Sequence, residues 1–289
     1  MCKQSERQDM MNLNIKKSLK KRPILKMLRK ILRKILKAIR RFSNRLGSKR
    51  KCYICGKTFS YFTKYGGGSK GENDFRKQID GVGSDFDNFG CMYCGCKDRE
   101  RHLFMFFDKL MLWENMENWR ILHFAPEICL LNKISEQTPL EYVKADLYPK
   151  NPDIMKINAT AIPFSNDTFD FLIANHILEH IPDYRRALSE FYRILKPGGI
   201  AVLQTPYSKL LRNNFEDEGI NSDELRFFFH GETVHVRTFG EKQFLKSLKD
   251  TGFSLQIKKH VDFFDAKTGY YYGVPIKEDL IMVAKQRGK

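Results

Sequence analysis

The 289 residues are enough for one full α/β domain with small additions, and their formal net charge of +17 is carried by residues 1–51. No apolar run approaches the roughly 18 to 20 residues of a membrane-spanning helix, and the start of the chain lacks the unbroken apolar core of a secretory signal. We therefore expect a cytoplasmic protein that does not span a membrane, with a body whose balanced charge does not favour polyanions.

The first predicted element is a basic amphipathic helix within an arm that covers residues 1–51. The arm holds 19 Lys or Arg and two acidic residues, and apolar residues recur at helical spacing over residues 23–46. A cationic helix with an Ile and Leu stripe suits an anionic membrane surface, which suggests peripheral contact with the inner face of the membrane. The alternative is packing on the protein's own body or on a partner. Nucleic acid is less favoured, because phosphate neutralisation needs no apolar stripe.

A cysteine-rich module is expected next, over residues 52–118. It contains two C-x-x-C pairs, each followed by glycine, and their members are Cys52, Cys55, Cys91 and Cys94. Without a secretory signal, such pairs are more typical of metal ligands than of disulfides. Four thiolates would close a tetrahedral, structural Zn²⁺ site with Cys96 as a spare, and the alternative is a set of buried cysteines without metal.

Residues 119–289 alternate between short apolar strands and amphipathic helices. Strands are predicted at residues 120–125, 142–146, 169–173, 200–204, 253–258 and 280–284. Residues 169–206 are the most informative, because they read as strand, polar turn, helix, Lys-Pro-Gly-Gly turn and strand, with Leu188, Phe191, Tyr192 and Leu195 on one helix face. This βαβ unit predicts a parallel sheet whose ligands lie outside the carboxyl ends of the strands.

Two phrases in this region, PFSNDTFDFLIANHILEH and ILKPGGIAVLQTP, resemble the later part of a class I S-adenosylmethionine (SAM)-dependent methyltransferase domain. The resemblance covers roughly residues 119–289. The pairing of ILHFAPE with the upstream cysteines is similar to a subgroup of these enzymes that carries an N-terminal zinc-binding module. The resemblance implies an α/β, Rossmann-like sheet of seven strands that ends in an antiparallel pair, with SAM as the cofactor.

The loop after the first strand departs from the family pattern. In the family this strand ends in an acidic residue and is followed by Gly-x-Gly, whose glycines let the backbone approach the cofactor. Here His123 stands at the acidic position, and Ala125 and Glu127 stand where the glycines would be. By the resemblance all three belong to the cofactor site, with the Glu127 carboxylate available to the ammonium group of SAM.

The later strands supply the other cofactor contacts that the resemblance implies. Asp146 ends the second strand, where an acid accepts both ribose hydroxyls, although a turn-forming Asp is the alternative. Asn158 replaces a residue that is often acidic in the family, and the backbone of Ala159 would meet the adenine edge. Asn175 follows the fourth strand and would lie beside the sulfonium.

Histidines are the candidates for a base if the acceptor is a hydroxyl, because imidazole titrates near neutrality. His176 follows the fourth strand, and His235 lies in an insert over residues 207–239 that would cover the substrate side. His180, one turn after His176, would contact substrate, fix the loop or serve a structural role.

The leading hypothesis is a SAM-dependent methyltransferase that acts on a small-molecule or glycan- or lipid-linked acceptor, with its arm on a membrane. One alternative is an RNA methyltransferase whose zinc module and basic arm hold the nucleic acid. Another is a non-catalytic zinc-binding scaffold on a degenerate methyltransferase fold, which His123, Ala125 and Asn158 support.

Overall fold

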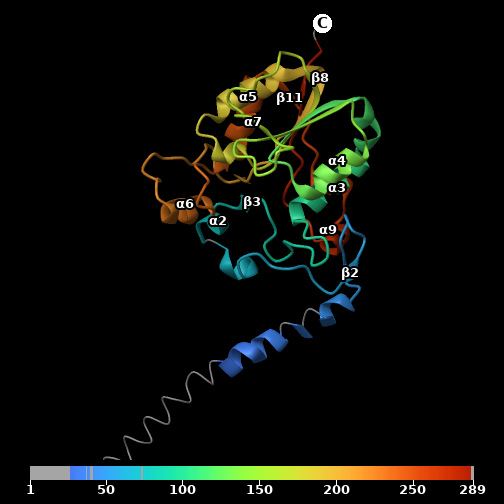
Figure 1. Cartoon of the computed structure of the whole chain (residues 1–289). Helices are drawn as coiled ribbons and strands as arrows, with labels where there is room; N and C mark the ends of the chain where they lie inside the picture. Colours follow the sequence, from blue (N-terminus) through green and yellow to red (C-terminus); the bar gives the residue numbers. More distant parts are fainter. Residues whose placement is uncertain (1–26, 37, 40–41, 73, 288–289) are drawn as a thin grey trace, which may run out of the picture. The chain divides into compact units, whose positions relative to one another are not determined.

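The computed structural model describes residues 27–36, 38–39, 42–72 and 74–287 (Figure 1). Contacts divide the chain into two compact units, which are residues 1–49 with 58–61 and residues 50–57 with 62–289. Within the described ranges, no helix has both the length and the apolar character needed to cross a bilayer.

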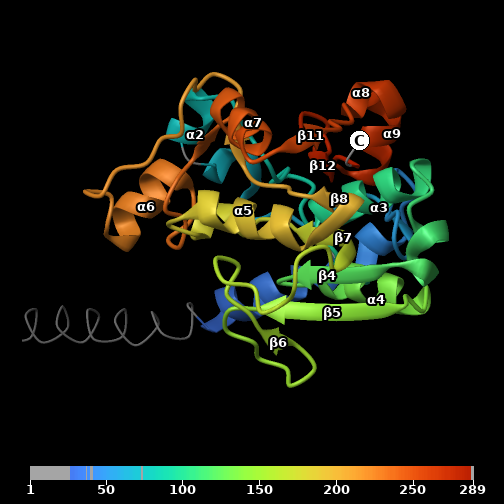
Figure 2. The same cartoon turned by 90° about the horizontal axis from the view of Figure 1, so that it is seen from above.

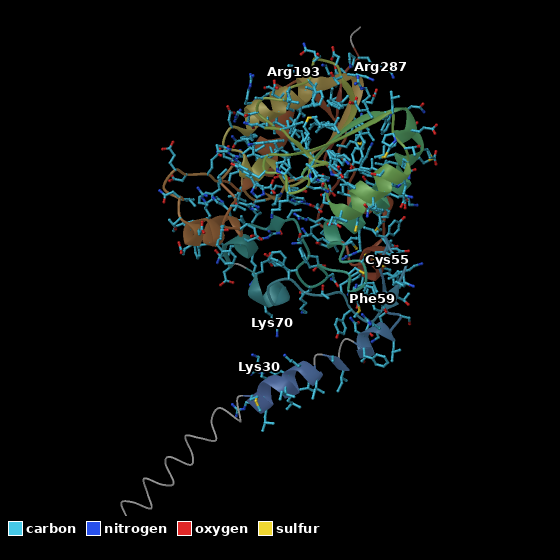
Figure 3. All side chains as sticks on the ribbon, viewed as in Figure 1. Lys30, Cys55, Phe59, Lys70, Arg193 and Arg287 are labelled. Atoms are coloured by element: carbon cyan, nitrogen blue, oxygen red, sulfur yellow. The ribbon has the colours of Figure 1, made fainter. Side chains whose placement is uncertain are left out.

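The first unit contains the arm helix, which we define as the helical residues 27–36, 38–39 and 42–45. The predicted helix is confirmed over these residues, and residues 23–26, 37 and 40–41 lie outside the described part. The large apolar side chains of the arm helix and of Leu46 directly after it are 45–76% exposed. Charged residues such as Lys30 are exposed on the same helix (Figure 3). The same unit includes β2 (Thr58–Phe59).

The second unit is built on a seven-stranded sheet in the order β11-β12-β8-β7-β4-β5-β6 (Figure 2). Its strands are β4 (Arg120–Phe124), β5 (Glu141–Asp146), β6 (Met155–Lys156), β7 (Phe169–Ala174), β8 (Leu195–Val202), β11 (Phe253–Leu255) and β12 (Met282–Lys285). The pairs from β6 to β8 are parallel, whereas β12 runs antiparallel to both β8 and β11. The predicted α/β sheet with an antiparallel pair at one edge is therefore confirmed.

Helices cover both faces of this sheet because its central strands are apolar on both sides. One core joins Leu122 and Phe124 to α5 (Tyr184–Ile194) and α7 (Glu241–Asp250). The other joins Ile121 to α3 (Asp98–Lys109) and α4 (Ile128–Glu136). The remaining helical segments are η1 (Gly68–Gly71), α2 (Asp74–Gln78), η2 (Trp113–Asn118), η3 (Leu178–His180), α6 (Asp223–His230), α8 (His260–Phe263) and α9 (Ala266–Tyr272).

A second, smaller sheet has the order β10-β9-β3. It joins β3 (Gly81–Val82), from the loop between the cysteine pairs, to β9 (Tyr207–Ser208) and β10 (Phe239–Gly240) of the insert. The other short strand of this unit is β1 (Arg50–Lys51). The cysteine-rich segment and the insert thus share backbone hydrogen bonds, which the sequence did not indicate.

The turn after α5 differs from the prediction. Leu195 pairs with Phe169 at the start of β8, so Leu195 belongs to the strand and not to the helix face. The register shifts between Phe169 and Phe171. This irregularity lets Pro197 and the two following glycines belong to the strand, instead of forming a turn between the helix and the strand. The strand then ends at Val202, two residues earlier than predicted.

Candidate active site

A cavity of about 770 Å³ opens at the carboxyl ends of the parallel strands. Four of the predicted cofactor residues line it, and they are Ala125, Asp146, Asn158 and Ala159. Its opposite wall comes from the loop after β7 and from the insert, through residues such as Ile177, His180 and Val234. The cavity therefore offers room for a ligand between the predicted cofactor residues and the predicted substrate side.

Ala125 adopts a backbone conformation that usually belongs to glycine. Its φ is 45°, in the left-handed region, and its N–H donates to the carbonyl oxygen of Ala145 over 2.7 Å. A residue with a Cβ costs about 1–2 kcal/mol in this conformation. The turn after β4 thus keeps the shape of a glycine turn although glycine is absent.

His123 and Glu127 belong to a hydrogen-bonded network whose members do not line the large cavity, and the Glu127 side chain is 19% exposed. Nε2 of His123 lies 2.9 Å from Oε2 of Glu127, and the Nδ2 group of Asn175 donates to the other Glu127 oxygen over 3.3 Å. Nδ1 of His123 lies 2.8 Å from the Tyr142 hydroxyl, and His123 is fully buried. Burial alone would raise the pKa of Glu127, but the hydrogen bond with His123 holds that pKa below its ordinary value. His123 therefore orients Glu127 and does not itself reach the cavity.

Asp146 and Asn158 both shape turns at the cavity wall. Oδ1 of Asp146 accepts from the Tyr148 N–H over 2.8 Å. The side-chain oxygen Oδ1 of Asn158 accepts from the N–H and the hydroxyl of Thr160 over 3.0 and 2.9 Å, which leaves the side-chain NH₂ group out of the turn. Both residues combine a turn-forming role with a place on the cavity wall.

His176 and His235 both lie near Glu179, a residue that the sequence analysis did not single out. Nδ1 of His176 is 3.5 Å and Nε2 of His235 is 3.9 Å from Oε1 of Glu179. His176 has a φ of 53° and lines a separate small cavity beside His102 and Glu278. Burial lowers the pKa of His176, and it lowers the pKa of His235 to about 4, so both imidazoles are neutral near pH 7. The carboxylate between two histidines, in the segment HILEH, is the sequence signal that could have identified Glu179.

Comparison with known proteins bears on the same part of the chain. Residues 115–258 match the model of a family described as a methyltransferase domain. This chain contains a methyltransferase domain. The match starts just before β4 and ends just after β11, so it includes every residue that lines the large cavity.

Curated relatives and solved structures match parts of the chain. A demethylmenaquinone methyltransferase of Lactococcus lactis is 34% identical over 133 residues, which cover 45% of this chain and 47% of the relative. One of Lysinibacillus sphaericus is 38% identical over 68 residues and 29% of its length. The chain thus spans half or less of these relatives. The crystal structure of a SAM-dependent methyltransferase from Mesorhizobium loti aligns with a TM-score of 0.46 and 14% identity over 62% of this chain and 97% of that one.

Arg237 ties the insert of the methyltransferase domain to the loop after β7. The buried guanidinium donates to the carbonyl oxygens of Leu178, Ile181 and Pro182 and forms a 2.6 Å ion pair with Glu216. These contacts give Arg237 a positioning role, because it fixes the loop that carries His180.

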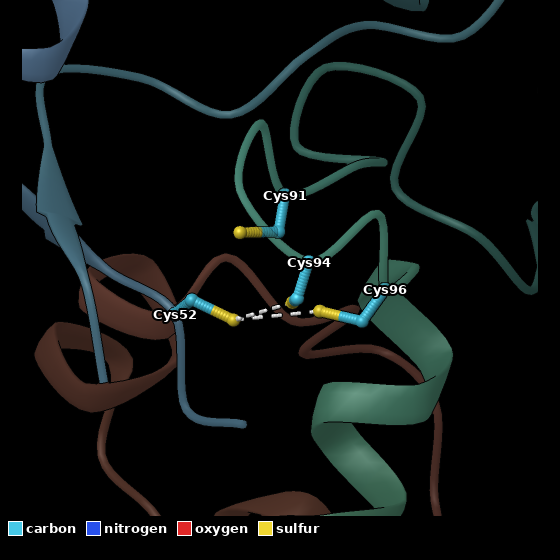
Figure 4. A group of neighbouring side chains, drawn as sticks. All are labelled: Cys52, Cys91, Cys94 and Cys96. Carbon is cyan, nitrogen blue, oxygen red and sulfur yellow. Dashed lines mark hydrogen bonds between the residues drawn. The ribbon is translucent and has the colours of Figure 1, made fainter. Parts of the chain in front are cut away.

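The cysteines upstream of the methyltransferase domain come together in space. Figure 4 shows the Cys52 sulfur pointing toward those of Cys94 and Cys96, at 3.7 and 3.4 Å. The Cys55 sulfur lies 3.8 Å from that of Cys91. The sulfurs that all lie within 4.8 Å of one another are those of Cys52, Cys91, Cys94 and Cys96. Two thiolates on one tetrahedral Zn²⁺ are about 3.8 Å apart, so the 3.7 and 3.8 Å distances fit a zinc site. The mutually close group contains Cys96 in place of the predicted ligand Cys55.

The two turns that hold the cysteine pairs have the same backbone form. Gly56 and Gly95 have φ values of 68° and 73°, and their N–H groups donate to the carbonyl oxygens of Cys52 and Cys91 over 3.0 Å each. Glycine is favoured there because a Cβ is strained at positive φ. Each turn therefore places its two thiols on one side of the backbone.

Proposed function

We propose that this protein is a SAM-dependent methyltransferase that acts on a small-molecule acceptor. The observation that carries the proposal is the cavity at the carboxyl ends of β4, β5 and β6, lined by Ala125, Asp146 and Asn158. Its volume of about 770 Å³ is within the range of about 300–1,000 Å³ for small-molecule sites. The family match over residues 115–258 supports the same activity.

Each residue of the proposed site has a chemical task toward the cofactor. SAM, when bound, supplies a methyl group on a good leaving group, so the protein mainly has to hold the acceptor in line and exclude water. Asp146 would accept hydrogen bonds from the ribose hydroxyls. The left-handed turn at Ala125 would let the backbone approach the cofactor, and the Glu127 carboxylate would attract its ammonium group.

An apolar ring is the acceptor that the substrate side of the cavity fits best. Ile177, Ile181 and Val234 line that side, together with the imidazole of His180. The Lactococcus relative is named for a quinone acceptor, so a quinone-like molecule is our first candidate and a glycan- or lipid-linked acceptor the alternative. Methyl transfer from tritiated SAM to separated quinone, lipid and RNA fractions tests this choice. Label in the RNA fraction alone would contradict it.

We further propose two auxiliary features, a structural Zn²⁺ on the cysteine pairs and contact of the arm with a membrane surface. The fitting sulfur distances support the first, and the exposed apolar residues of the arm helix support the second. A closed four-thiolate shell would leave no position for a substrate, so the zinc would hold the fold and take no part in methyl transfer.

Cofactor binding is tested by replacing Asp146. We expect SAM to raise the midpoint of thermal unfolding, by an amount that corresponds to about 2.7 kcal/mol at a hundredfold excess over Kd. The Asp146→Ala variant should bind SAM at least about tenfold more weakly in calorimetry, because it loses charge-assisted hydrogen bonds. The exposed Asp153, replaced by Ala, is the matched control. The proposal fails if the unaltered protein shows neither a shift nor a binding heat.

A further inference from the structure

Glu179, His180 and His235 form a cluster beside the proposed acceptor site. One nitrogen of each imidazole and one carboxylate oxygen all lie within 4.8 Å of one another. Glu179 and His180 belong to η3, which begins four residues after the end of β7, and His235 comes from the insert. The backbone holds the two segments together, because the N–H of Val236 donates to the carbonyl oxygen of Glu179 over 3.0 Å. The cluster is thus assembled from both walls of the substrate side.

The two histidines are held in the form that binds metals. Nδ1 of His180 lies 3.1 Å from the carbonyl oxygen of Val234, and Nδ1 of His235 lies 3.3 Å from that of His230. A carbonyl oxygen can only accept, so Nδ1 carries a hydrogen in each ring and Nε2 is the nitrogen left for a metal. Histidines that bind a metal usually donate their second N–H in this way.

The carboxylate of Glu179 lacks a partner for one of its oxygens. Its side chain is 1% exposed, and Oε1 makes no hydrogen bond among the described residues; Nδ1 of His176, which also has no partner there, lies 3.5 Å away. The other oxygen accepts from the Thr205 hydroxyl over 3.0 Å. A buried carboxylate oxygen without a donor is unfavourable, and a cation would satisfy it.

The distance between His235 and Glu179 suits two ligands of one ion. With bonds of about 2.1 Å, two atoms on one ion are at most about 4.2 Å apart. Nε2 of His235 and Oε1 of Glu179 are 3.9 Å apart, within that limit. His180 is exposed and lines the large cavity, so an ion bound there would face that cavity.

We propose that Glu179, His180 and His235 bind a divalent transition-metal ion that holds an oxygen of the methyl acceptor. Two imidazoles and one carboxylate suit first-row ions, and three protein ligands leave positions open for water and substrate. The part of this inference that concerns the acceptor rests on the proposed methyltransferase function. A hydroxyl on the ion would lose its proton to solvent more readily, so His176 and His235 would not have to act as bases.

Binding of Mn²⁺ to the full chain, followed by electron paramagnetic resonance, tests the site. Mn²⁺ prefers oxygen and nitrogen ligands, so it discriminates against the thiols. We expect one bound Mn²⁺ per chain, and an affinity at least about tenfold lower in Glu179→Gln and His180→Ala. Glu278→Gln is the matched control, because Glu278 is also buried with an unpartnered Oε1 but lies outside the cluster.

The outcomes separate the metal site from the methyltransferase function. Loss of Mn²⁺ binding in His180→Ala, with full binding in Glu278→Gln, supports the site. Because His180 is exposed, His180→Ala still tests the site if Glu179→Gln fails to fold. Absence of Mn²⁺ binding in the unaltered protein, or equal binding in His180→Ala, overturns it. SAM calorimetry on the same preparation decides the function independently, because SAM binding without Mn²⁺ binding rejects only the metal.

Discussion

At the scale of single residues, Ala125 holds a strained turn that should respond to substitution. Glycine would remove the cost of about 1–2 kcal/mol at positive φ but would give the unfolded chain about 0.4–1 kcal/mol more entropy. We therefore expect Ala125→Gly to raise the free energy of unfolding, measured with urea, by up to about 1 kcal/mol. Ala187→Gly, within α5, should lower it by a similar amount. Equal losses in both variants would contradict this assignment of strain.

The choice of zinc ligands is a second prediction at this scale. Backbone N–H groups donate to the sulfurs of Cys55, from Lys57, and of Cys91, from Tyr93, as expected of thiolates that bind a metal. We therefore expect one zinc per chain by atomic emission, little zinc in Cys55→Ser, and full content in Cys96→Ser. The reverse pattern would make Cys96 a ligand instead of Cys55. The short distance between the Cys52 and Cys96 sulfurs would agree with that result.

Sequence reasoning at this scale identified residues of the cavity wall better than it identified the contacts between histidines and carboxylates. The family pattern placed Asp146 and Asn158 after their strands, and both line the cavity. It could not reveal that His123 is buried against Tyr142, because that contact depends on two neighbouring strands. Glu179 was missed because one acid in a helical turn usually faces solvent.

At the scale of elements, the arm helix presents an apolar stripe that a membrane can bury. Ile31 and Ile35 lie one turn apart and are 45% and 50% exposed. We expect the full chain to float with anionic vesicles and less with neutral ones, because each basic residue near the surface contributes about 1 kcal/mol. Replacing Ile31 and Ile35 by Ser should weaken flotation at least tenfold. Each lost side chain removes about 1.5–3 kcal/mol of the free energy gained by burying apolar surface.

The control for the flotation experiment keeps the apolar stripe and changes only the branching of two side chains. Replacing Ile31 and Ile35 by Leu preserves the apolar area and the charge, so this variant should float like the unaltered chain. If the Leu and Ser variants float equally, the stripe does not contact the vesicle. Packing on another part of the protein would then be the better explanation.

The elements differ in how well their patterns predict them. The central strands were predicted because both faces are buried and the runs are mostly apolar, as in β7, where Asp170 is the one charged residue. The strands β3, β9 and β10 have two residues each, which is too short for any periodic signal. The start of β8 was misassigned because a Pro-Gly-Gly segment usually ends an element, whereas here a register shift accommodates it.

At the scale of the whole second unit, Arg101 connects the cysteine-rich segment to the C-terminal part of the chain. Its fully buried guanidinium donates to the carbonyl oxygens of Cys96, Tyr272 and Gly273 over 3.1, 2.9 and 2.6 Å. It also lies 3.9 Å from the ring centroid of Phe62. These contacts make the upstream segment part of the same cooperative structure as the sheet.

We expect Arg101→Met to lower the free energy of unfolding by about 3–5 kcal/mol, because it leaves several buried carbonyls without a donor. Arg186→Gln, whose side chain is 60% exposed, should change it by less than about 0.5 kcal/mol. Urea unfolding followed by circular dichroism measures both. A small effect of Arg101→Met would indicate that water replaces its hydrogen bonds.

The pairing of Gly81 with Ser208 also bears on how the chain is made. At about 5–20 residues per second, a ribosome needs roughly 6–25 s to synthesise the segment between these partners. During that time the early glycine-rich loop has no strand to pair with, and its closure over so long a separation is slow. The cysteine-rich segment is therefore expected to finish folding late in synthesis, well after its own residues have left the exit tunnel.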